Sequence, residues 1–174
     1  TIRNGHSHRG GGLRLENSFL SLNNCIFENN TATGSTPDNS EALGGAIYSL
    51  HSFVTIHSTI FRNNTAVVPD ENGSDTINAV SAYGGAVYIQ PGNCVFLDCV
   101  FESNTATGGS AYTETLVNDT AHAKGGSAYG GAVCIWDRYF QTDDTIINCR
   151  FENNQATGGH SRAFHQADSH AGHS

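Results

Sequence analysis

One short pattern occurs four times along the chain, and it sets the limits on what the chain can fold into. Each copy opens with two glycines and a small apolar residue, as in Gly44-Gly45-Ala46-Ile47, and closes with a spaced set such as Phe61, Asn64 and Ala66. The other openings begin at Gly10, Gly84 and Gly130, and the other closings begin at Phe27, Phe101 and Phe151. Repeats of this length form stacked units, because a single unit cannot bury its apolar face alone.

The spacing of the copies separates rigid segments from variable ones. The openings lie 34, 40 and 46 residues apart, and the closings lie 34, 40 and 50 residues apart. The distance from opening to closing is 17 residues in the first three copies and 21 in the fourth, whose extra residues fall within 137–144. Nearly all other length variation lies between a closing and the next opening. This alternation is typical of a solenoid with long variable loops on one side.

Alignment of the copies indicates which side chains point inward. The four closing phenylalanines form one apolar column, and a second column consists of Leu22, Ile56, Phe96 and Ile146. Ile56 and Phe61 cannot both face inward from one straight strand, because side chains alternate with a period of two. A corner is therefore predicted at His57-Ser58. Short strands that meet at corners predict an all-β parallel β-helix, a single segment over 1–174 with about four coils that start near residues 10, 44, 84 and 130.

The glycines and asparagines have mechanical roles in such a coil. The Gly-Gly-Ala opening permits a tight turn and a close approach of neighbouring coils, since glycine has no Cβ to clash. The closing asparagines are expected to stack at a second corner, bonded amide to amide or amide to backbone; the alternative is solvated turn residues. The predicted structural ladder comprises Phe27, Phe61, Phe101, Phe151, Asn30, Asn64, Asn104 and Asn154.

The composition limits the partners. The formal net charge is −8 and the eight basic residues are scattered, which argues against nucleic acid or an anionic membrane surface as a partner. No apolar run approaches the roughly 20 residues of a membrane span, so direct membrane insertion is not expected. Twenty glycines and few long side chains disfavour long helices. No cofactor is predicted.

The five cysteines contain no Cys-x-x-Cys pair, so no zinc or other metal site is predicted. Cys99 and Cys149 fall in one inward column on adjacent coils, about 4.8 Å apart by strand spacing. A disulfide and a ladder of buried free thiols both fit that spacing. Cys94 and Cys134 lie near the ends of neighbouring segments and could join two coils. Such bridges would favour an oxidising compartment.

Two other groups of residues suggest modification or binding. Four N-glycosylation sequons begin at Asn29, Asn63, Asn72 and Asn118, and glycans on the two in the variable loops would be sterically free. Chance sequons are the alternative in so Asn-rich a chain. The nine histidines include His160, His165, His170 and His173. Their irregular spacing predicts solvated loop residues and not metal ligands.

Catalysis is not expected. Parallel β-helices that cleave polysaccharides need stacked Asp residues for calcium with a basic residue, or an Asp pair across a cleft. Here Asp143 and Asp144 are adjacent on the inserted loop and have no partner carboxylate in the other copies. The alternative function is a carbohydrate-binding or polysaccharide-cleaving module that uses 137–144. Aromatic residues there could stack on a sugar or cap the core; they are Trp136, Tyr139 and Phe140.

The Gly-Gly-Ala-[Ile/Val/Leu] openings and Phe-x-x-Asn closings resemble those of the chlamydial polymorphic outer-membrane proteins and related β-helix adhesin-like passengers. The resemblance covers the whole chain. It implies a right-handed parallel β-helix, and the general right-handed rule for parallel crossovers agrees. It also implies a cell-surface or secreted location and adhesive or structural work.

The two ends of the chain fall at nearly the same phase of the repeat, without a capping element. Uncapped solenoids expose strand edges, so we expect either a piece of a longer β-helix or a fibre subunit that stacks head to tail. The expected partners are copies of the chain or further coils end to end, with a host surface or glycans as lateral partners. The predicted function is that of an extracellular or cell-surface structural and adhesive protein.

Overall fold

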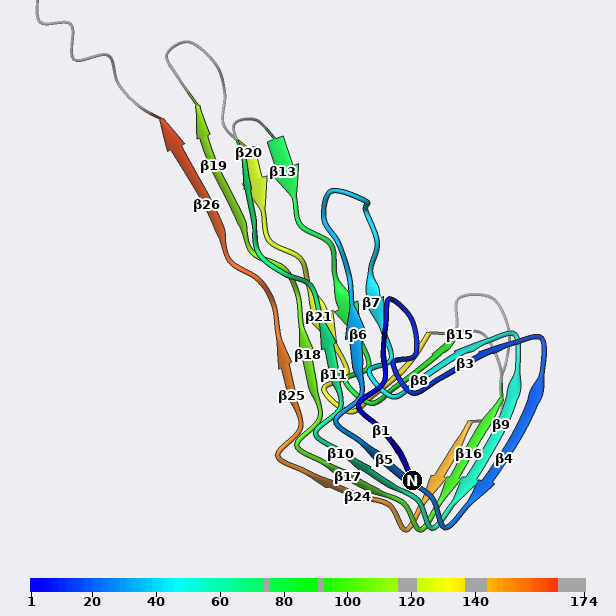
Figure 1. Cartoon of the computed structure of the whole chain (residues 1–174). Helices are drawn as coiled ribbons and strands as arrows, with labels where there is room; N and C mark the ends of the chain where they lie inside the picture. Colours follow the sequence, from blue (N-terminus) through cyan, green and yellow to red (C-terminus); the bar gives the residue numbers. More distant parts are fainter. Residues whose placement is uncertain (74–75, 91–92, 116–121, 137–143, 166–174) are drawn as a thin grey trace, which may run out of the picture.

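The computed structural model describes residues 1–73, 76–90, 93–115, 122–136 and 144–165, and all regular elements in these ranges are β-strands. Strands pair in parallel with their counterparts one repeat away. Figure 1 shows the resulting stack of coils, which consists of a three-sided body and a long arm. The predicted parallel β-helix is therefore confirmed, while its right hand stays a prediction. The described residues contain no helix long and apolar enough to cross a membrane.

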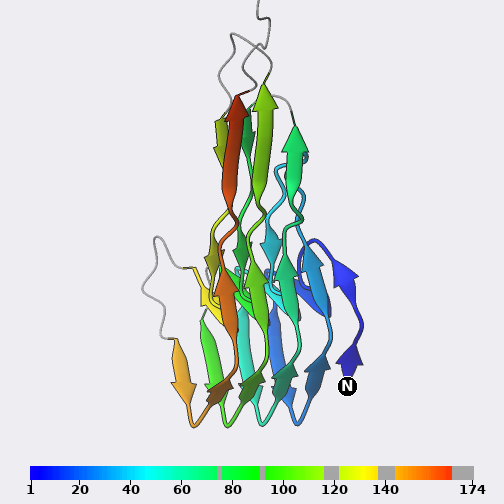
Figure 2. The same ribbon diagram turned by 90° about the vertical axis from the view of Figure 1, so that its left-hand side faces the viewer.

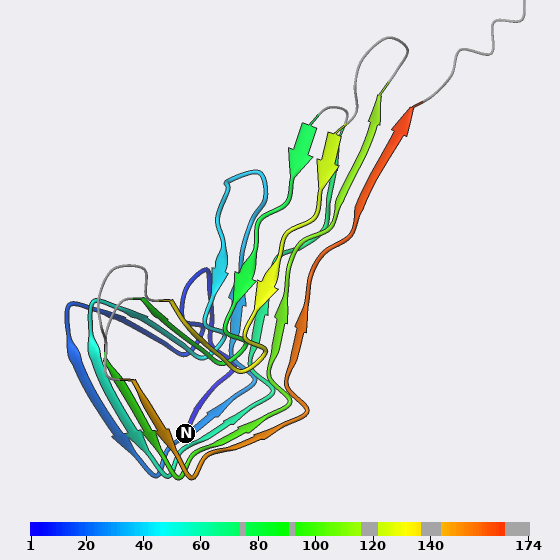
Figure 3. The same ribbon diagram turned by 180° about the vertical axis from the view of Figure 1, so that it is seen from behind.

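Three sheets form the sides of the body, which Figure 3 shows from behind. The first wall contains β3 (Leu13–Glu16), β8 (Ile47–Leu50), β15 (Val87–Gln90) and β22 (Val133–Ile135). The second wall contains β4 (Phe19–Asn23), β9 (Phe53–His57), β16 (Cys94–Leu97) and β23 (Thr145–Ile147). The third wall contains β1 (Ile2–Arg3), β5 (Ile26–Glu28), β10 (Ile60–Arg62), β17 (Val100–Glu102) and β24 (Arg150–Glu152).

The arm has an outgoing wall and a return wall. The outgoing wall starts with β2 (His6–Ser7), β6 (Thr31–Thr33), β11 (Thr65–Val67), β18 (Thr105–Thr107) and β25 (Gln155–Thr157). It continues in β12 (Glu71–Gly73), β19 (Ala111–Thr115) and β26 (Ser161–His165). The return wall contains β13 (Thr76–Asn78), β20 (His122–Lys124), β7 (Ala42–Leu43), β14 (Ala82–Tyr83) and β21 (Ala128–Tyr129). The segments predicted as variable loops are thus partly paired strands, and Figure 2 shows them side by side above the body.

The corners of the body are formed by residues in the left-handed backbone conformation. The predicted corner at His57-Ser58 is present, with φ of 47° at Ser58, and Asn24, Asp98 and Asn148 hold the same place in the other coils with φ between 51° and 52°. Asparagine and aspartate tolerate this conformation better than most residues because their short polar side chains bond locally. Each opening glycine, such as Gly84 with φ of 61°, turns the return wall into the next coil.

Large apolar side chains fill the body. Phe27, Phe61 and Phe101 are fully buried, as are Ile56 and Phe96 from the second inward column. The fourth coil differs from the expectation, since Phe151 is 46% exposed and Ile146 is 45% exposed. Both residues lie in the inward columns, but no described strand pairs with the outer edge of β23 or β24.

The arm has a thinner interior. Its two walls meet over alanines and valines that are buried between them: Ala42, Ala66, Val68, Val80, Ala82 and Ala106. A third cluster fills the angle where the arm leaves the body, and it contains Leu43, Tyr48, Tyr88 and Cys134 with Tyr83 and Trp136 at its margin. These aromatic residues brace the arm against the first wall.

Candidate functional site

The side chains singled out as a ladder stack coil upon coil. Rings of successive closing phenylalanines lie 5.1, 4.9 and 4.7 Å apart, centroid to centroid, and nearly parallel. Each asparagine amide donates to the Oδ1 atom of the next, at 3.0 Å from Asn30 to Asn64, 3.0 Å from Asn64 to Asn104 and 2.9 Å from Asn104 to Asn154. The same Oδ1 atoms accept backbone N–H groups. The ladder therefore satisfies polar groups that the corner would otherwise bury unpaired.

The five cysteines are free thiols in the structure, and the predicted bridges are not formed. Cys99 and Cys149 do lie in one column, where the Cys99 N–H donates to Cys149 Sγ at 3.4 Å, but the Cys99 thiol donates to the Leu97 carbonyl. The pairing of Cys94 with Cys134 is wrong for a geometric reason. Cys94 points into the body core, whereas Cys134 points to the other side of a different wall, into the aromatic angle.

Burial controls the chemistry of these thiols. It raises the pKa of Cys99 and of Cys134 from 9.0 to about 11, because the thiolate would lose its hydration. Burial also raises the pKa of Cys94, and the nearby Asp144 carboxylate adds to that effect. Asp144 accepts the Cys94 N–H at 3.0 Å, so this carboxylate of the predicted alternative site links two coils. Asp143 and the rest of 137–143 lie outside the described residues.

The candidate glycosylation residues within the described ranges are exposed. Asn29 and Asn63 occupy left-handed corners, with φ of 55° and 54°, and Asn72 lies in β12 of the arm. Asn118 falls outside the described residues, as do His170 and His173. Glycosylation stays a prediction.

Three polar side chains on the outer surface contact one another in the order serine, histidine and aspartate, as in the triad of a hydrolase. Ser58 Oγ lies 2.8 Å from His57 Nδ1, and His57 Nε2 lies 3.1 Å from Asp98 Oδ2. A hydrolase also needs oxyanion donors in a water-excluded cleft. The His57 and Asp98 side chains are 43% and 50% exposed, however, so they lie in water and not in such a cleft. These contacts join adjacent corners. No group of three or more metal-ligating side chains occurs in the described part of the chain.

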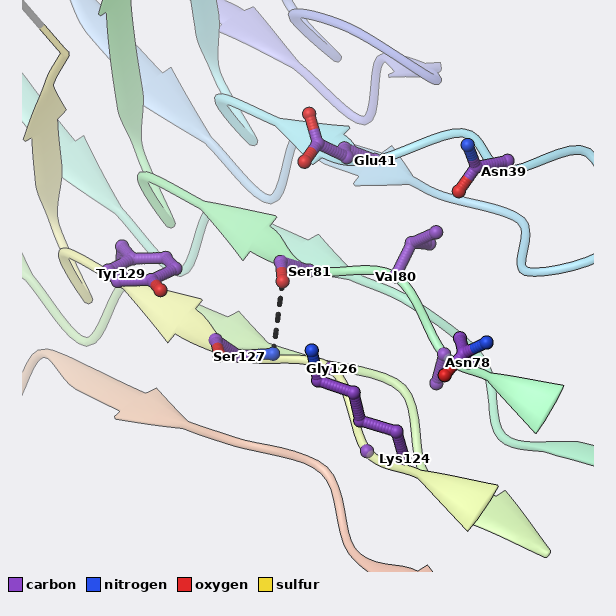
Figure 4. Close-up of a pocket in the computed structure, with 11 residues that line it drawn as sticks. Asn39, Glu41, Asn78, Val80, Ser81, Lys124, Gly126, Ser127 and Tyr129 are labelled. Atoms are coloured by element: carbon purple, nitrogen blue, oxygen red, sulfur yellow. Dashed lines mark hydrogen bonds between the residues drawn. The ribbon is translucent and has the colours of Figure 1, made fainter. Parts of the chain in front are cut away.

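The most varied set of functional groups lies on the arm. A groove of about 350 Å³ follows the bend of the return wall, between the sheet of β13 and β20 and the sheet of β7, β14 and β21. Figure 4 shows that three successive coils contribute to it. It is lined by Asn39, Glu41, Asn78, Ala79, Val80, Ser81, Lys124, Gly125, Gly126, Ser127 and Tyr129.

A glycine allows two coils to approach closely beside this groove. At Gly126 the backbone N–H donates to the Gly109 carbonyl of the outgoing wall at 2.8 Å. A Cβ at Gly126 would stand 1.9 Å from the carbonyl oxygen of Val80, a backbone atom of the neighbouring coil. The two coils can approach this closely only without a side chain here.

Strand register aligns the polar groups of the groove. Ala42, Ala82 and Ala128 pair in register on neighbouring coils. The residues that precede them are therefore aligned as well: Glu41, Ser81 and Ser127. The Ser127 N–H donates to Ser81 Oγ at 3.0 Å, which Figure 4 marks with a dashed line. Hydroxyl, carboxylate and amide groups therefore follow the groove from coil to coil.

The aromatic ring of Tyr129 forms one end of the groove. Tyr129 stacks on Tyr83 with centroids 4.9 Å apart and an angle of 13°, and 42% of Tyr129 remains exposed. Trp136 contacts Tyr129 edge to face at 6.1 Å. Burial raises the pKa of Tyr83 to about 12, and the negative charge of Glu41 adds to the shift. Tyr83 is therefore neutral at physiological pH and supports the exposed ring of Tyr129.

The groove carries one charge of each sign. Lys124, the single lysine of the chain, and Glu41 are both exposed. Neither takes part in the ion pairs found among the described residues. Lys124 is thus exposed to a ligand, and the Glu41 carboxylate, which interacts with the Tyr83 side chain, has further acceptor positions to offer.

Sequence reasoning missed this groove. The relevant signal is a seven-residue segment, Ser-Ala-Tyr-Gly-Gly-Ala-Val, which occurs unchanged at 81–87 and at 127–133. The Gly-Gly opening within it was recognised, but the serine and tyrosine before the opening were not. Their role depends on the bend in the return wall, which the repeat pattern alone does not predict.

Stacked parallel coils with in-register ladders define the chain as a parallel β-helix repeat protein. Residues 24–50 and 58–90 match the family model of the Chlamydia polymorphic membrane protein repeat, so the predicted resemblance is confirmed over these residues. The two matches together cover less than half of the chain, and each runs from a left-handed corner through the arm into the next coil. No curated protein and no solved structure matches the chain.

Proposed function

We propose that the chain is a non-catalytic, cell-surface β-helix that works as a structural and adhesive element. Two segments of the chain match the repeat of a family named for polymorphic membrane proteins of Chlamydia, which supports a location at the cell surface. The body supplies rigidity, and the arm supplies the contact surface.

The observation that carries this proposal is the contrast in length between body and arm. Body strands keep their register in successive coils, as in the pairing of Phe61 with Phe27 and Phe101. The outer part of the arm instead becomes longer from coil to coil. Among the described residues, the first coil has no outer strand, the second has the three residues of β12, and the third has the five residues of β19. A rigid stack that presents a changing lateral surface suits adhesion.

Adhesion can be tested with beads coated with the purified chain and applied to cultured epithelial cells. We expect the chain-coated beads to be retained more than beads coated with serum albumin. Beads coated with a heat-denatured sample of the same chain control for non-specific stickiness. Equal retention of native-chain and albumin beads would contradict the adhesive role.

We also propose that further coils, or copies of the chain, stack on the face of the fourth coil. A groove of about 320 Å³ opens there, and its apolar lining includes Val133, Ile135, Ile146 and Phe151. A stacked copy would continue the body register, with Ile2 opposite Phe151 and Arg3 opposite Glu152. Sedimentation velocity over a range of concentrations should show association that Phe151→Asp abolishes. A concentration-independent monomer would contradict stacking between copies.

A further inference from the structure

We propose that the groove on the return wall, lined by Glu41, Ser81, Lys124, Ser127 and Tyr129, is a binding site for a short oligosaccharide. This inference rests on the proposed adhesive function and names the class of ligand for it. The site is separate from 137–144, because it is built from the arm segments that precede the openings of the second, third and fourth coils.

The exposed ring of Tyr129 is suited to the apolar face of a sugar. Its 42% exposure leaves the ring face opposite Tyr83 available when no further coil is stacked on the fourth coil, while stacking on Tyr83 and the edge contact with Trp136 hold the ring in place. A ring fixed in this way loses little conformational freedom when a ligand packs on it. Rigid aromatic platforms of this kind give contact area at low entropic cost.

The polar groups beside the ring match a ligand rich in hydroxyl groups. A sugar hydroxyl both donates and accepts, and the groove offers the acceptor-only carboxylate of Glu41, the hydroxyl of Ser127, and amides that do both. Asn39 and Asn78 supply these amides, and both are exposed at the rim. The polar column spans three coils, about 10 Å at the spacing of parallel strands, so the groove is longer than a single sugar ring.

The charges of the groove argue against other ligand classes. A net charge of −8 and a single lysine disfavour nucleic acids and other polyanions, which need clustered cations. The lining holds few large apolar side chains that could anchor a peptide. Lys124 can still pair with one carboxylate, so an oligosaccharide with a single acidic sugar fits as well as a neutral one. The volume lies near the lower end of small-ligand sites.

The test is a glycan array of neutral, N-acetylated and uronic-acid oligosaccharides, probed with the whole chain. The strongest array ligand is then titrated by calorimetry against three variants. Tyr129→Ala should weaken binding about tenfold through loss of ring stacking, and Tyr129→Phe should retain it because the ring remains. Phe19→Ala is the matched control, since that ring is 83% exposed on the second wall of the body, away from the arm. Thermal unfolding checks that the variants fold.

The outcomes separate this inference from the adhesive function. Binding that Tyr129→Ala weakens and Phe19→Ala leaves unchanged supports the groove as the site. An array without bound glycans, or binding that is equal in Tyr129→Ala and the parent chain, overturns the inference. Beads that adhere to cells equally well with Tyr129→Ala would leave the adhesive function intact while removing the groove from it. Beads that fail to adhere while the chain binds array glycans would contradict the adhesive function alone.

Discussion

The body and the arm are built from the same repeats, yet their interiors differ in the size of the side chains that fill them. The body buries phenylalanines and isoleucines, such as Phe61, Phe96 and Ile56, with no measurable exposure. The arm buries small residues, such as Ala66, Ala82 and Ala106. Three walls enclose a wide space that large side chains must fill, whereas two facing walls leave room only for small side chains.

This difference explains why the arm varies more in length than the body. The three walls of the body must close in each coil, so an added residue within a wall would shift its ladder out of register. The four extra residues of the fourth coil fall within 137–144, between β22 and β23. The arm has no such closure condition, because an outgoing strand and a return strand can both be extended together. Most length changes therefore lie in the arm, and the groove lies where the arm bends. The predictions below test whether the body tolerates less change than the arm.

The largest effect is expected from Phe101→Asp in the body. Phe101 is fully buried between the rings of Phe61 and Phe151, so the substitution leaves an unpaired charge in the core. We expect a loss of about 4 kcal/mol or more in the free energy of unfolding, measured by urea denaturation with circular dichroism. Phe53→Asp is the control, because Phe53 is 52% exposed; similar losses in the two variants would contradict the assignment of the interior.

A somewhat smaller effect is expected from Asn64→Leu. The substitution removes the Oδ1 atom that accepts the Asn30 N–H at 3.1 Å and the Asn30 amide at 3.0 Å. It also removes donors to Asn104 Oδ1 and the Phe27 carbonyl. Buried polar groups left unpaired should cost about 3 kcal/mol of unfolding free energy. Asn72→Leu, at an exposed position on the arm, should change stability by less than about 0.5 kcal/mol, and an equal loss there would show that the ladder carries no special weight.

The body followed directly from the sequence because each of its features repeats. Asparagine follows phenylalanine by three residues in every copy, and the opening precedes the phenylalanine by 17 residues in the first three copies, so side-chain orientation and the corner at His57-Ser58 could be derived by alignment. The same logic failed for Cys94 and Cys134. Their sequence positions suggested proximity, but the wall to which each belongs and the face to which each points depend on three-dimensional register.

The arm and its groove could not be derived in this way. Variable length between closings and openings was interpreted as loops, although β12 and β19 pair over Glu71–Gly73 and continue the outgoing wall. The site residues Glu41 and Lys124 occur once each and belong to no repeated pattern. They line one groove because arm segments of different length return to the same wall in register, and such a placement leaves no periodic signal in the sequence.

A third comparison places a glycine-to-alanine substitution at the body–arm junction and in the arm. Gly85→Ala would put a Cβ 2.1 Å from the Gly131 carbonyl oxygen and 2.5 Å from the Thr105 nitrogen, and both are backbone atoms of the body–arm junction. Gly73→Ala in the arm would meet only the end of the Ile77 side chain, at 3.0 Å. We expect a loss of about 2 kcal/mol for Gly85→Ala and little change for Gly73→Ala. Thermal unfolding midpoints measure both, and the reverse order would overturn the idea that coil spacing is fixed at the junction.

The smallest effect concerns alkaline pH and lies in the body. The pKa of the Cys99 thiol is 9.0 in an ordinary setting and about 11 in the fold, so the unfolded chain loses this proton first as the pH rises. The contribution of the protonated Cys99 thiol to the free energy of unfolding is therefore complete below pH 9 and is lost as the pH rises toward 11. Between pH 8 and about pH 9.7 the free energy of unfolding should fall by about 1 kcal/mol from this group. Cys99→Thr should remove that part of the fall, since Thr59 already fills the equivalent place in the second coil and bonds the His57 carbonyl at 3.0 Å. Urea titrations of parent and variant at the two pH values give the comparison, and identical slopes against pH would show that the buried thiol does not contribute.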